Sequence, residues 1–208
     1  MMKRQDNNKI KSLGIFCGSS AGRGEAYGEM AVGMARRLVH EGITMVYGGG
    51  NVGLMGIMAS EMLATGGEVI GVIPSHLASR ELVHPGVEKM HVVEGMAERK
   101  ALMAELSCAF VALPGGFGTL DEIFEMLTSL QLGLSGKPCG LLNIEGFWDP
   151  LVLQIERCRE EQFLSQIHRD HLLVHDDPES LLDALREYTT RKHDDTLWIN
   201  GLKENNRY

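Results

Sequence analysis

The chain has 208 residues, of which 44% are hydrophobic and 23% are charged, and its formal net charge is −8. This composition is ordinary for a globular protein and is sufficient for one sizeable core. No run of lysine and arginine stands out, and no apolar run approaches the roughly 18 residues of a membrane span. We therefore expect neither a nucleic-acid partner nor a membrane-embedded segment.

The two ends of the chain are polar. Residues 1–11 lack the apolar core of a signal peptide, and we expect a flexible lead there. Residues 189–208 predict a polar tail, which leaves residues 12–188 as a single domain. The missing signal peptide also leads us to expect a cytoplasmic protein. The four cysteines form no CxxC pair and favour buried free thiols over disulfides or a metal site.

Strand and helix patterns alternate along this domain. Strands are predicted at residues 13–17, 44–47, 68–73, 109–113 and 140–143, with a further extended segment at residues 89–93. Helices are predicted at residues 26–40, 54–65, 96–106, 123–132, 150–161 and 178–188. The last two follow Asp149-Pro150 and Asp177-Pro178, a pattern typical of an N-cap and a first helical residue. The alternation predicts a Rossmann-like α/β domain, a parallel sheet with helices on both faces.

Three glycine-rich loops follow predicted strands, at residues 18–24, 48–53 and 114–119. In an open α/β sheet, ligands bind beyond the carboxyl ends of the strands. Glycines let the backbone approach a ligand and expose N–H groups at a helix N-terminus, which suits a phosphate. The chain lacks the P-loop pattern GxxxxGK[ST], and the second loop lacks the spacing of a dinucleotide fingerprint.

The third loop is the most informative one. It reads Pro114-Gly-Gly-Phe-Gly-Thr119, and the carboxylate of Glu122 is expected on the first turn of the helix that follows. A phosphate site and a carboxylate in one loop indicate chemistry on a sugar phosphate. Taken alone, however, Thr119 and Glu122 also fit a capping box, with Thr119 as N-cap and Glu122 as the third helical residue.

These residues resemble the LONELY GUY family, the cytokinin riboside 5′-monophosphate phosphoribohydrolases. The family motif PGGxGTxxE matches residues 114–122, and its Arg-Lys pair matches Arg99-Lys100. The resemblance extends over residues 13–153. The chain departs from the family at Ala97, Asp121 and Ser129, where many members have His, Glu and Trp, and these departures leave substrate preference and dimer packing open.

The resemblance implies hydrolysis of the N-glycosidic bond of a purine nucleoside 5′-monophosphate, AMP or an N6-modified form, to free base and ribose 5-phosphate. Glu122 would stabilise positive charge on the ribose or activate water, and Arg99 would be the second catalytic residue. Without the resemblance, Arg99 fits a solvated arginine in the first turn of a helix. No metal or organic cofactor is required. A homodimer or larger homo-oligomer is expected, with the apolar surplus of residues 123–134 at its seam.

The expected substrate-binding residues lie in the three loops, in the irregular segment 75–86 and at the start of the helix 96–106. They are Gly18, Ser19, Ser20, Gly49, Gly50, Glu81, Met96, Lys100, Gly115, Gly116, Gly118 and Thr119. For Ser19 and Ser20, capping of local backbone is an equal alternative. The alternatives are a turn for Gly49 and Gly50, an exposed loop acid for Glu81, and simple packing for Met96.

Two other functions compete with hydrolysis: a carrier protein, and a different nucleotide transferase, because ribosyl transfer and hydrolysis share a transition state. A nucleotide- or molybdenum-cofactor-carrying protein can be built on the same scaffold, and fold alone does not separate carrier from enzyme. Glu122 together with Arg99 favours the enzyme. The older family label of lysine decarboxylase has no support in the sequence, because no constellation for a pyridoxal phosphate site stands out. His168, His171 and His175 lack the spacing of a zinc site and predict a local cluster.

Overall fold

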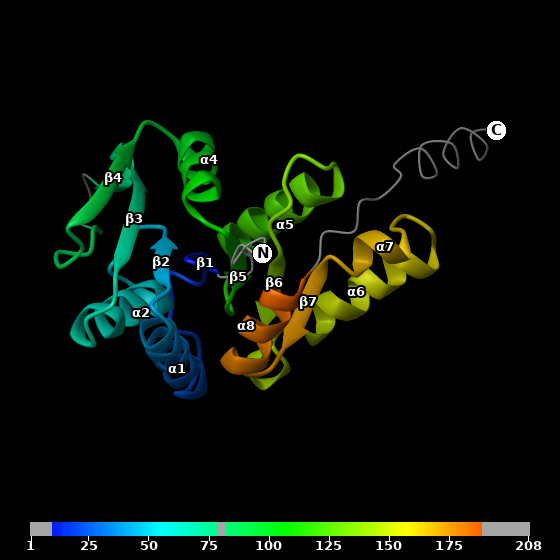
Figure 1. The fold of residues 1–208 in the computed structure, drawn as a ribbon, viewed down its shortest axis with the longest axis horizontal. Coiled ribbons are helices and arrows are strands. Elements are labelled where there is room, and N and C mark those ends of the chain that lie inside the picture. Colours follow the sequence, from blue (N-terminus) through cyan, green and yellow to red (C-terminus); the bar gives the residue numbers. More distant parts are fainter. Residues whose placement is uncertain (1–9, 79–81, 189–208) are drawn as a thin grey trace, which may run out of the picture.

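The computed structural model describes residues 10–78 and 82–188. Seven strands form one sheet in the order β4-β3-β2-β1-β5-β6-β7, and every neighbouring pair is parallel (Figure 1). The strands are β1 (Ser12–Phe16), β2 (Thr44–Tyr47), β3 (Val69–Pro74), β4 (Lys89–Val93), β5 (Ala109–Ala112), β6 (Cys139–Leu142) and β7 (Leu172–His175).

Helices cover both faces of this sheet, as the sequence predicts (Figure 1). One face carries α1 (Ala26–Glu41), α2 (Gly53–Ala64) and α8 (Pro178–Glu187). The other face carries α4 (Met96–Leu106), α5 (Phe117–Gln131) and α6 (Asp149–Glu160). Three shorter helical segments lie in connections: α3 (Ser75–Ala78), the 3-10 turn η1 (Ile144–Gly146) and α7 (Gln166–Arg169). The predicted Rossmann-like α/β fold is confirmed.

The core consists of two layers because successive strand side chains point to opposite faces of the sheet. In β5, Val111 packs into the layer under α1, α2 and α8, whereas Phe110 packs under α4 and α5. Phe110 stacks on Phe16 of β1 with ring centroids 5.8 Å apart. Gly14 lies beneath this stack, and a Cβ there would come within 2.6 Å of the Phe110 ring. The central strands β1 and β5 are thus closely packed on the face that α4 and α5 cover.

The structure adds elements that the sequence pattern does not predict. β7 pairs with β6 at one edge of the sheet, and α7 precedes it. The segment of residues 75–86, expected to be irregular, begins with the short helix α3. Each of these three elements has only four residues. Segments this short carry little helical or alternating pattern of their own.

Most of the expected lead, residues 1–9, and the whole expected tail, residues 189–208, lie outside the described residues. Ile10, which we expected in the lead, is buried in the core. The Lys11 carbonyl accepts a hydrogen bond of 3.0 Å from the Thr44 N–H. Within residues 10–78 and 82–188, no helix combines the length and the apolarity that crossing a membrane requires. All four cysteines are free, with Cys17 and Cys139 buried.

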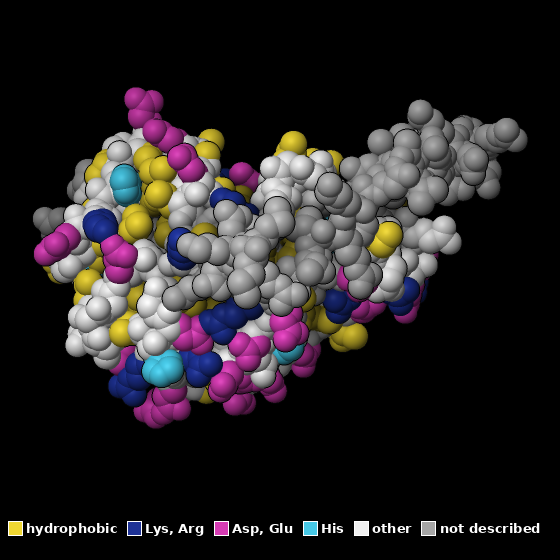
Figure 2. Space-filling model, in the orientation of Figure 1, with side chains coloured by type: hydrophobic (Ala, Val, Ile, Leu, Met, Phe, Trp, Pro, Cys, Tyr) yellow, Lys and Arg dark blue, Asp and Glu magenta, His cyan; other side chains and the backbone are white. Residues whose placement is uncertain are grey.

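Charges of both signs alternate on the face of the molecule shown in Figure 2, along the edge formed by α1 and α8. Arg37 contacts Glu41 and Glu179 there, and Arg186 contacts Glu41 and Asp183. Mixed charge of this kind is not the one-sided basic field typical of nucleic-acid binding.

Candidate active site

Two glycine-rich loops meet at the switch point of the sheet, where the strand order reverses. β1 and β5 are neighbours, yet α1 and α5, the helices after them, cover opposite faces. Such a switch point leaves a crevice at the carboxyl ends of the strands, where α/β proteins bind ligands. The Gly18 N–H donates to the Pro114 carbonyl at 3.0 Å, and the Leu54 N–H donates to the Gly18 carbonyl at 3.1 Å. Backbone hydrogen bonds therefore join the loops after β1 and β5 to the start of α2.

The loops are packed too closely for side chains at two of their glycines. A Cβ on Gly115 would lie 2.1 Å from Oγ1 of Thr119. A Cβ on Gly53 would lie 2.3 Å from the carbonyl carbon of Ser19, and Gly53 also has a φ of +55°. Larger residues at these positions would push the loops apart. Glycine is thus required for the geometry of the crevice and does more than permit a turn.

Helix α5 begins earlier than the sequence predicts. Its N-cap is Gly116, and no side chain caps its first N–H groups. Thr119 lies inside the helix, and Glu122 lies on its second turn, not its first. The capping-box alternative is therefore wrong, because Thr119 is not the N-cap. The first-turn N–H groups stay available for an anion, and the Glu122 carboxylate is not used as a cap.

The Glu122 carboxylate pairs with Arg99, which α4 supplies from the same side of the sheet. Nη2 of Arg99 lies 3.0 Å from Oε1 of Glu122. The two residues are only 9% and 5% exposed, so Arg99 is not a solvated arginine. Nε of Arg99 and Oε1 of Glu122 have no aligned hydrogen-bond partner. The two residues form an ion pair, yet two of their buried polar atoms lack hydrogen bonds. Such unsatisfied atoms cost free energy unless a ligand or a water molecule bonds to them.

The loop after β2 makes room for the guanidinium group. A Cβ on Gly48 would lie 2.1 Å from Nη2 of Arg99. On its other side, Nη1 of Arg99 donates to Sδ of Met96 at 3.6 Å, and the Met96 side chain is partly exposed. The position of Arg99 therefore depends on a glycine in one loop and on a methionine one turn earlier in its own helix.

The charges around Glu122 act in opposite directions on its pKa. Burial raises the pKa of Glu122, and Arg99 counteracts this effect; Asp121 and Glu125 raise it, whereas Lys100 lowers it. Burial also raises the pKa of the Cys17 thiol, with a further contribution from Glu122. Cys17 is therefore a neutral thiol near the pair. A carboxylate with a raised pKa is a stronger proton acceptor than an exposed glutamate.

Lys100, an expected substrate-binding residue, contacts acidic side chains of α5. Its Nζ lies 2.9 Å from Oδ2 of Asp121 and also contacts Oε2 of Glu125. The Lys100 side chain is largely buried between the two helices. Its ammonium group thus links α4 to α5, directly beside the residues that carry the catalytic candidates.

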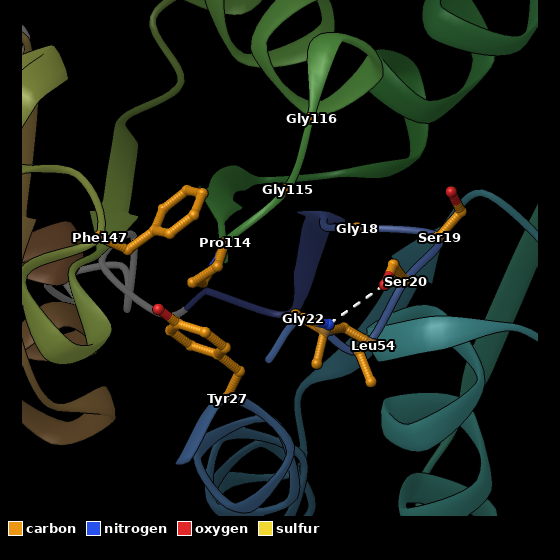
Figure 3. A pocket seen from close by; sticks show the side chains of 11 residues that line it. Gly18, Ser19, Ser20, Gly22, Tyr27, Leu54, Pro114, Gly115, Gly116 and Phe147 are labelled. Carbon is orange, nitrogen blue, oxygen red and sulfur yellow. Dashed lines mark hydrogen bonds between the residues drawn. The ribbon is translucent and has the colours of Figure 1, made fainter. Parts of the chain in front are cut away.

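A cavity of about 280 Å³ lies beside the paired loops (Figure 3). It is lined by Gly18, Ser19, Ser20, Ala21, Gly22, Tyr27, Leu54, Pro114, Gly115, Gly116 and Phe147. Five of these residues were expected to bind substrate. Arg99 and Glu122 are not part of the wall: they come from α4 and α5, whereas α1 and α2 supply Tyr27 and Leu54. The loop at residues 114–119 connects the cavity to the catalytic candidates, because Gly115 lines the cavity and packs against Thr119.

The remaining expected residues have mixed environments. Ser20 accepts a hydrogen bond of 3.2 Å from the Gly22 N–H, which is the local role given as its alternative. Gly49 has a φ of +77°, and its carbonyl accepts a hydrogen bond of 3.0 Å from the His84 N–H. Gly50 forms a bridge with Val83. Gly118 lies on the first turn of α5 with open space around it, and Glu81 lies outside the described residues.

Sequence reasoning missed the aromatic side of the cavity. Tyr27 and Phe147 form an edge-to-face pair with ring centroids 5.9 Å apart (Figure 3). Tyr27 is at the start of α1, and Phe147 follows η1. Neither belongs to a glycine motif, so only the aromatic character near a loop could have signalled them. The buried Tyr47 hydroxyl, at the end of β2, was also missed, and it has no hydrogen-bond partner among the described residues.

The histidines near the C-terminal half form local contacts. The Tyr188 hydroxyl and Nδ1 of His171 are 2.8 Å apart, and the His168 and His171 rings pack at 5.8 Å. Across the part of the chain that the structure describes, no group of three or more His, Cys, Asp or Glu side chains could hold a metal ion.

Glycine-rich loops at the carboxyl edge of a parallel sheet, with a buried arginine–glutamate pair, define an enzyme of the Rossmann-like nucleotide class. A family model described as "Possible lysine decarboxylase" matches residues 55–185. The chain is 48% identical over 177 residues to the cytokinin riboside 5′-monophosphate phosphoribohydrolase of Rhodococcoides fascians, which covers 85% of this chain and 89% of that protein. It is 42% identical over 184 residues to an Arabidopsis thaliana protein of the same name, covering 88% and 86%. The chain therefore belongs to the LONELY GUY family.

Solved structures with the same fold include proteins of a different kind. The molybdenum cofactor carrier protein of Chlamydomonas reinhardtii aligns with a TM-score of 0.64 and 21% identity, covering 86% of this chain and 98% of that one. The molybdenum cofactor binding protein of Rippkaea orientalis aligns with a TM-score of 0.62 and 22% identity, covering 82% and 92%. At this identity the likeness supports the fold and does not carry the cofactor over to this chain.

Proposed function

We propose that the protein hydrolyses the N-glycosidic bond of a purine nucleoside 5′-monophosphate, AMP or an N6-modified AMP, to free base and ribose 5-phosphate. The observation that carries this proposal is the buried Arg99–Glu122 pair, whose polar atoms are incompletely bonded, beside an uncapped helix N-terminus. The names of the relatives at 48% and 42% identity support the same reaction. A carrier would need the loops but would have no use for the buried carboxylate.

The 5′-phosphate is assigned to the loop at residues 114–119. Gly115, Gly116 and Gly118 offer backbone N–H groups at the start of α5, and Thr119 offers a hydroxyl. The dipole of α5 favours negative charge at that end. Gly18 and Ser19 face the same space from the loop after β1. This assignment explains why a monophosphate, rather than a nucleoside, is the expected substrate.

Cleavage proceeds by departure of the base with the electrons of the glycosidic bond, which leaves positive charge on the ribose. The Glu122 carboxylate stabilises that charge and accepts a proton from the attacking water. Water supplies the hydroxyl group at C1′ and the proton on the released base, so the atoms balance. Arg99 remains charged and donates hydrogen bonds to the substrate, since a guanidinium group does not release its proton at neutral pH. This reaction uses no metal or organic cofactor.

We also propose a homodimer or larger homo-oligomer in the cytoplasm. Helix α5 and the loop after it expose Phe124, Leu132 and Leu134 to 39%, 53% and 78%. Exposed apolar residues gathered on this helix and the loop after it favour a second copy as partner. The four free cysteines suit a reducing compartment.

The test measures release of free base from AMP and from N6-isopentenyl-AMP, each beside its dephosphorylated nucleoside. We expect release from the monophosphates alone. Glu122→Gln should lose nearly all turnover while it keeps its fold, and Glu105→Gln, at an exposed glutamate of α4, should behave like the unchanged protein. Phosphorylated ligand that binds without release of base would contradict hydrolysis and favour the carrier. The ratio of the two rates gives the preference for an N6 side chain.

A further inference from the structure

Lys100 follows Arg99 in the chain, but the two side chains have different surroundings. Successive residues of a helix point about 100° apart, so the two side chains reach different carboxylates. Arg99 reaches the Glu122 carboxylate, whereas the Lys100 ammonium group contacts Asp121 and Glu125. Lys100 does not line the cavity beside the glycine loops. Its role is therefore to be sought in its contacts with α5.

The two partners of Lys100 flank Glu122 on α5. Asp121 is its neighbour in the chain, and Glu125 follows it by three residues, which places the two on adjacent turns of one helix face. Their side chains are 57% and 42% exposed, whereas Lys100 is 15% exposed. Two uncompensated negative charges at these positions would disfavour the ionised form of Glu122. One ammonium group contacts both of them.

We propose that Lys100 is a positioning residue, which fastens α4 to α5 and neutralises the two carboxylates that flank Glu122. The inference rests on the proposed function, in which the ionised Glu122 carboxylate acts on the substrate. It changes the role expected for Lys100 from binding the substrate to controlling a catalytic group. Because Lys100 holds α4 and α5 together next to Arg99, the distance between Arg99 and Glu122 is fixed as well.

The charges that face Glu122 determine the direction of the effect. Arg99 and Lys100 on α4 lower the pKa of Glu122, Asp121 and Glu125 on α5 raise it, and burial raises it most. Cys17, from the loop after β1, is a neutral thiol. Removal of the Lys100 charge leaves Asp121 and Glu125 without compensation, and the pKa of Glu122 rises. At a given pH, a smaller fraction of Glu122 is then ionised, so the acid limb of the activity profile moves to higher pH.

The experiment follows the Glu122 carboxyl group directly. Carbon-13 NMR of the full-length protein gives the pKa of Glu122 in the unchanged chain and in Lys100→Met. We expect this pKa to rise by about half a unit or more, as a charge several ångströms away requires. Lys100→Arg keeps the charge and should titrate like the unchanged protein. Lys89→Met is the matched control, because Lys89 also pairs with a carboxylate, Glu68, at the amino edge of the sheet.

Activity gives a second and independent readout. The acid limb of base release from AMP should move in Lys100→Met, chiefly through kcat. In Lys100→Met/Asp121→Asn/Glu125→Gln, both flanking charges are also absent, and the limb should return toward its original position. An unchanged Glu122 titration in Lys100→Met would overturn the inference. So would a rise in KM that the triple variant does not reverse, since this is the signature of direct substrate binding. If the unchanged protein releases no base, the proposed function fails, while the NMR titration still decides the role of Lys100.

Discussion

At the scale of single residues, the position of Arg99 depends on the absence of a side chain at Gly48. A Cβ at that position would lie 2.1 Å from Nη2 of Arg99, well inside van der Waals contact. We predict that Gly48→Ala displaces the guanidinium group and lowers base release roughly 10- to 100-fold, because displacements of this size disturb catalytic geometry. The measurement is kcat/KM for AMP, with circular dichroism to verify the fold.

Gly33→Ala is the control for this variant. Gly33 lies within α1, and a Cβ there meets no atom within 4 Å. Alanine in a helix is more favourable than glycine by about 0.5–1 kcal/mol, so this variant should be at least as stable as the unchanged protein and fully active. Equal activity of Gly48→Ala and Gly33→Ala would show that Arg99 does not need the space above Gly48.

At the scale of elements, two identical sequence signals have different outcomes. Asp177-Pro178 predicts an N-cap, and the Asp177 side chain indeed accepts a hydrogen bond of 2.8 Å from the Ser180 N–H at the start of α8. Asp149-Pro150 predicts the same, but α6 begins at Asp149 itself. The Asp149 carboxylate accepts a hydrogen bond from Nδ2 of Asn143 instead. Asn143 thus binds the carboxylate that would otherwise cap the helix, and the Asp-Pro pattern does not reveal this contact.

The Asp177 cap makes a measurable contribution to stability. Asp177→Ala should lower the free energy of unfolding by about 1 kcal/mol, and Asp177→Asn should retain most of the cap. The Ser180 N–H holds the pKa of Asp177 below its ordinary value. A lowered pKa stabilises the fold above the ordinary aspartate range near pH 4, and the effect is lost as the pH falls through the folded-state pKa.

Urea unfolding of the three proteins at neutral and acidic pH checks this contribution. The gap between the unchanged protein and Asp177→Ala should be present at pH 7 and shrink in strong acid. A gap that is independent of pH would mean that the carboxylate charge does not matter to the cap.

At the scale of the whole molecule, the sequence predicts the site's location better than its contacts. The loops at residues 18–24 and 114–119 could be placed together because the carboxyl ends of parallel strands share one edge. The pairing of Arg99 with Glu122 could not be derived from pattern, since it requires α4 and α5 to cover the same face at a specific height. The start of α5 was placed too late because Gly118 and Thr119 resemble residues that precede a helix. The wall formed by Tyr27 and Phe147 depends on tertiary packing between α1 and the η1 region.

If a second copy covers the apolar side of α5, then Leu134→Lys places an ammonium group against an apolar surface, which is unfavourable. We expect the unchanged protein to sediment as two or more chains and Leu134→Lys to sediment as a smaller species in analytical ultracentrifugation. Folding of the single chain should not suffer, because Leu134 is 78% exposed.

Val92→Lys provides the comparison, since Val92 is also apolar and 59% exposed but lies on the edge strand β4, which three strands separate from β5 beneath α5. It should keep the mass of the unchanged protein. If both variants dissociate, the seam is not confined to α5. If the unchanged protein is already a single chain, the exposed apolar residues of α5 need another partner. Equal masses for all three proteins, at two chains or more, would place the contact on a different surface, and the apolar surplus of α5 would no longer be an argument for self-association.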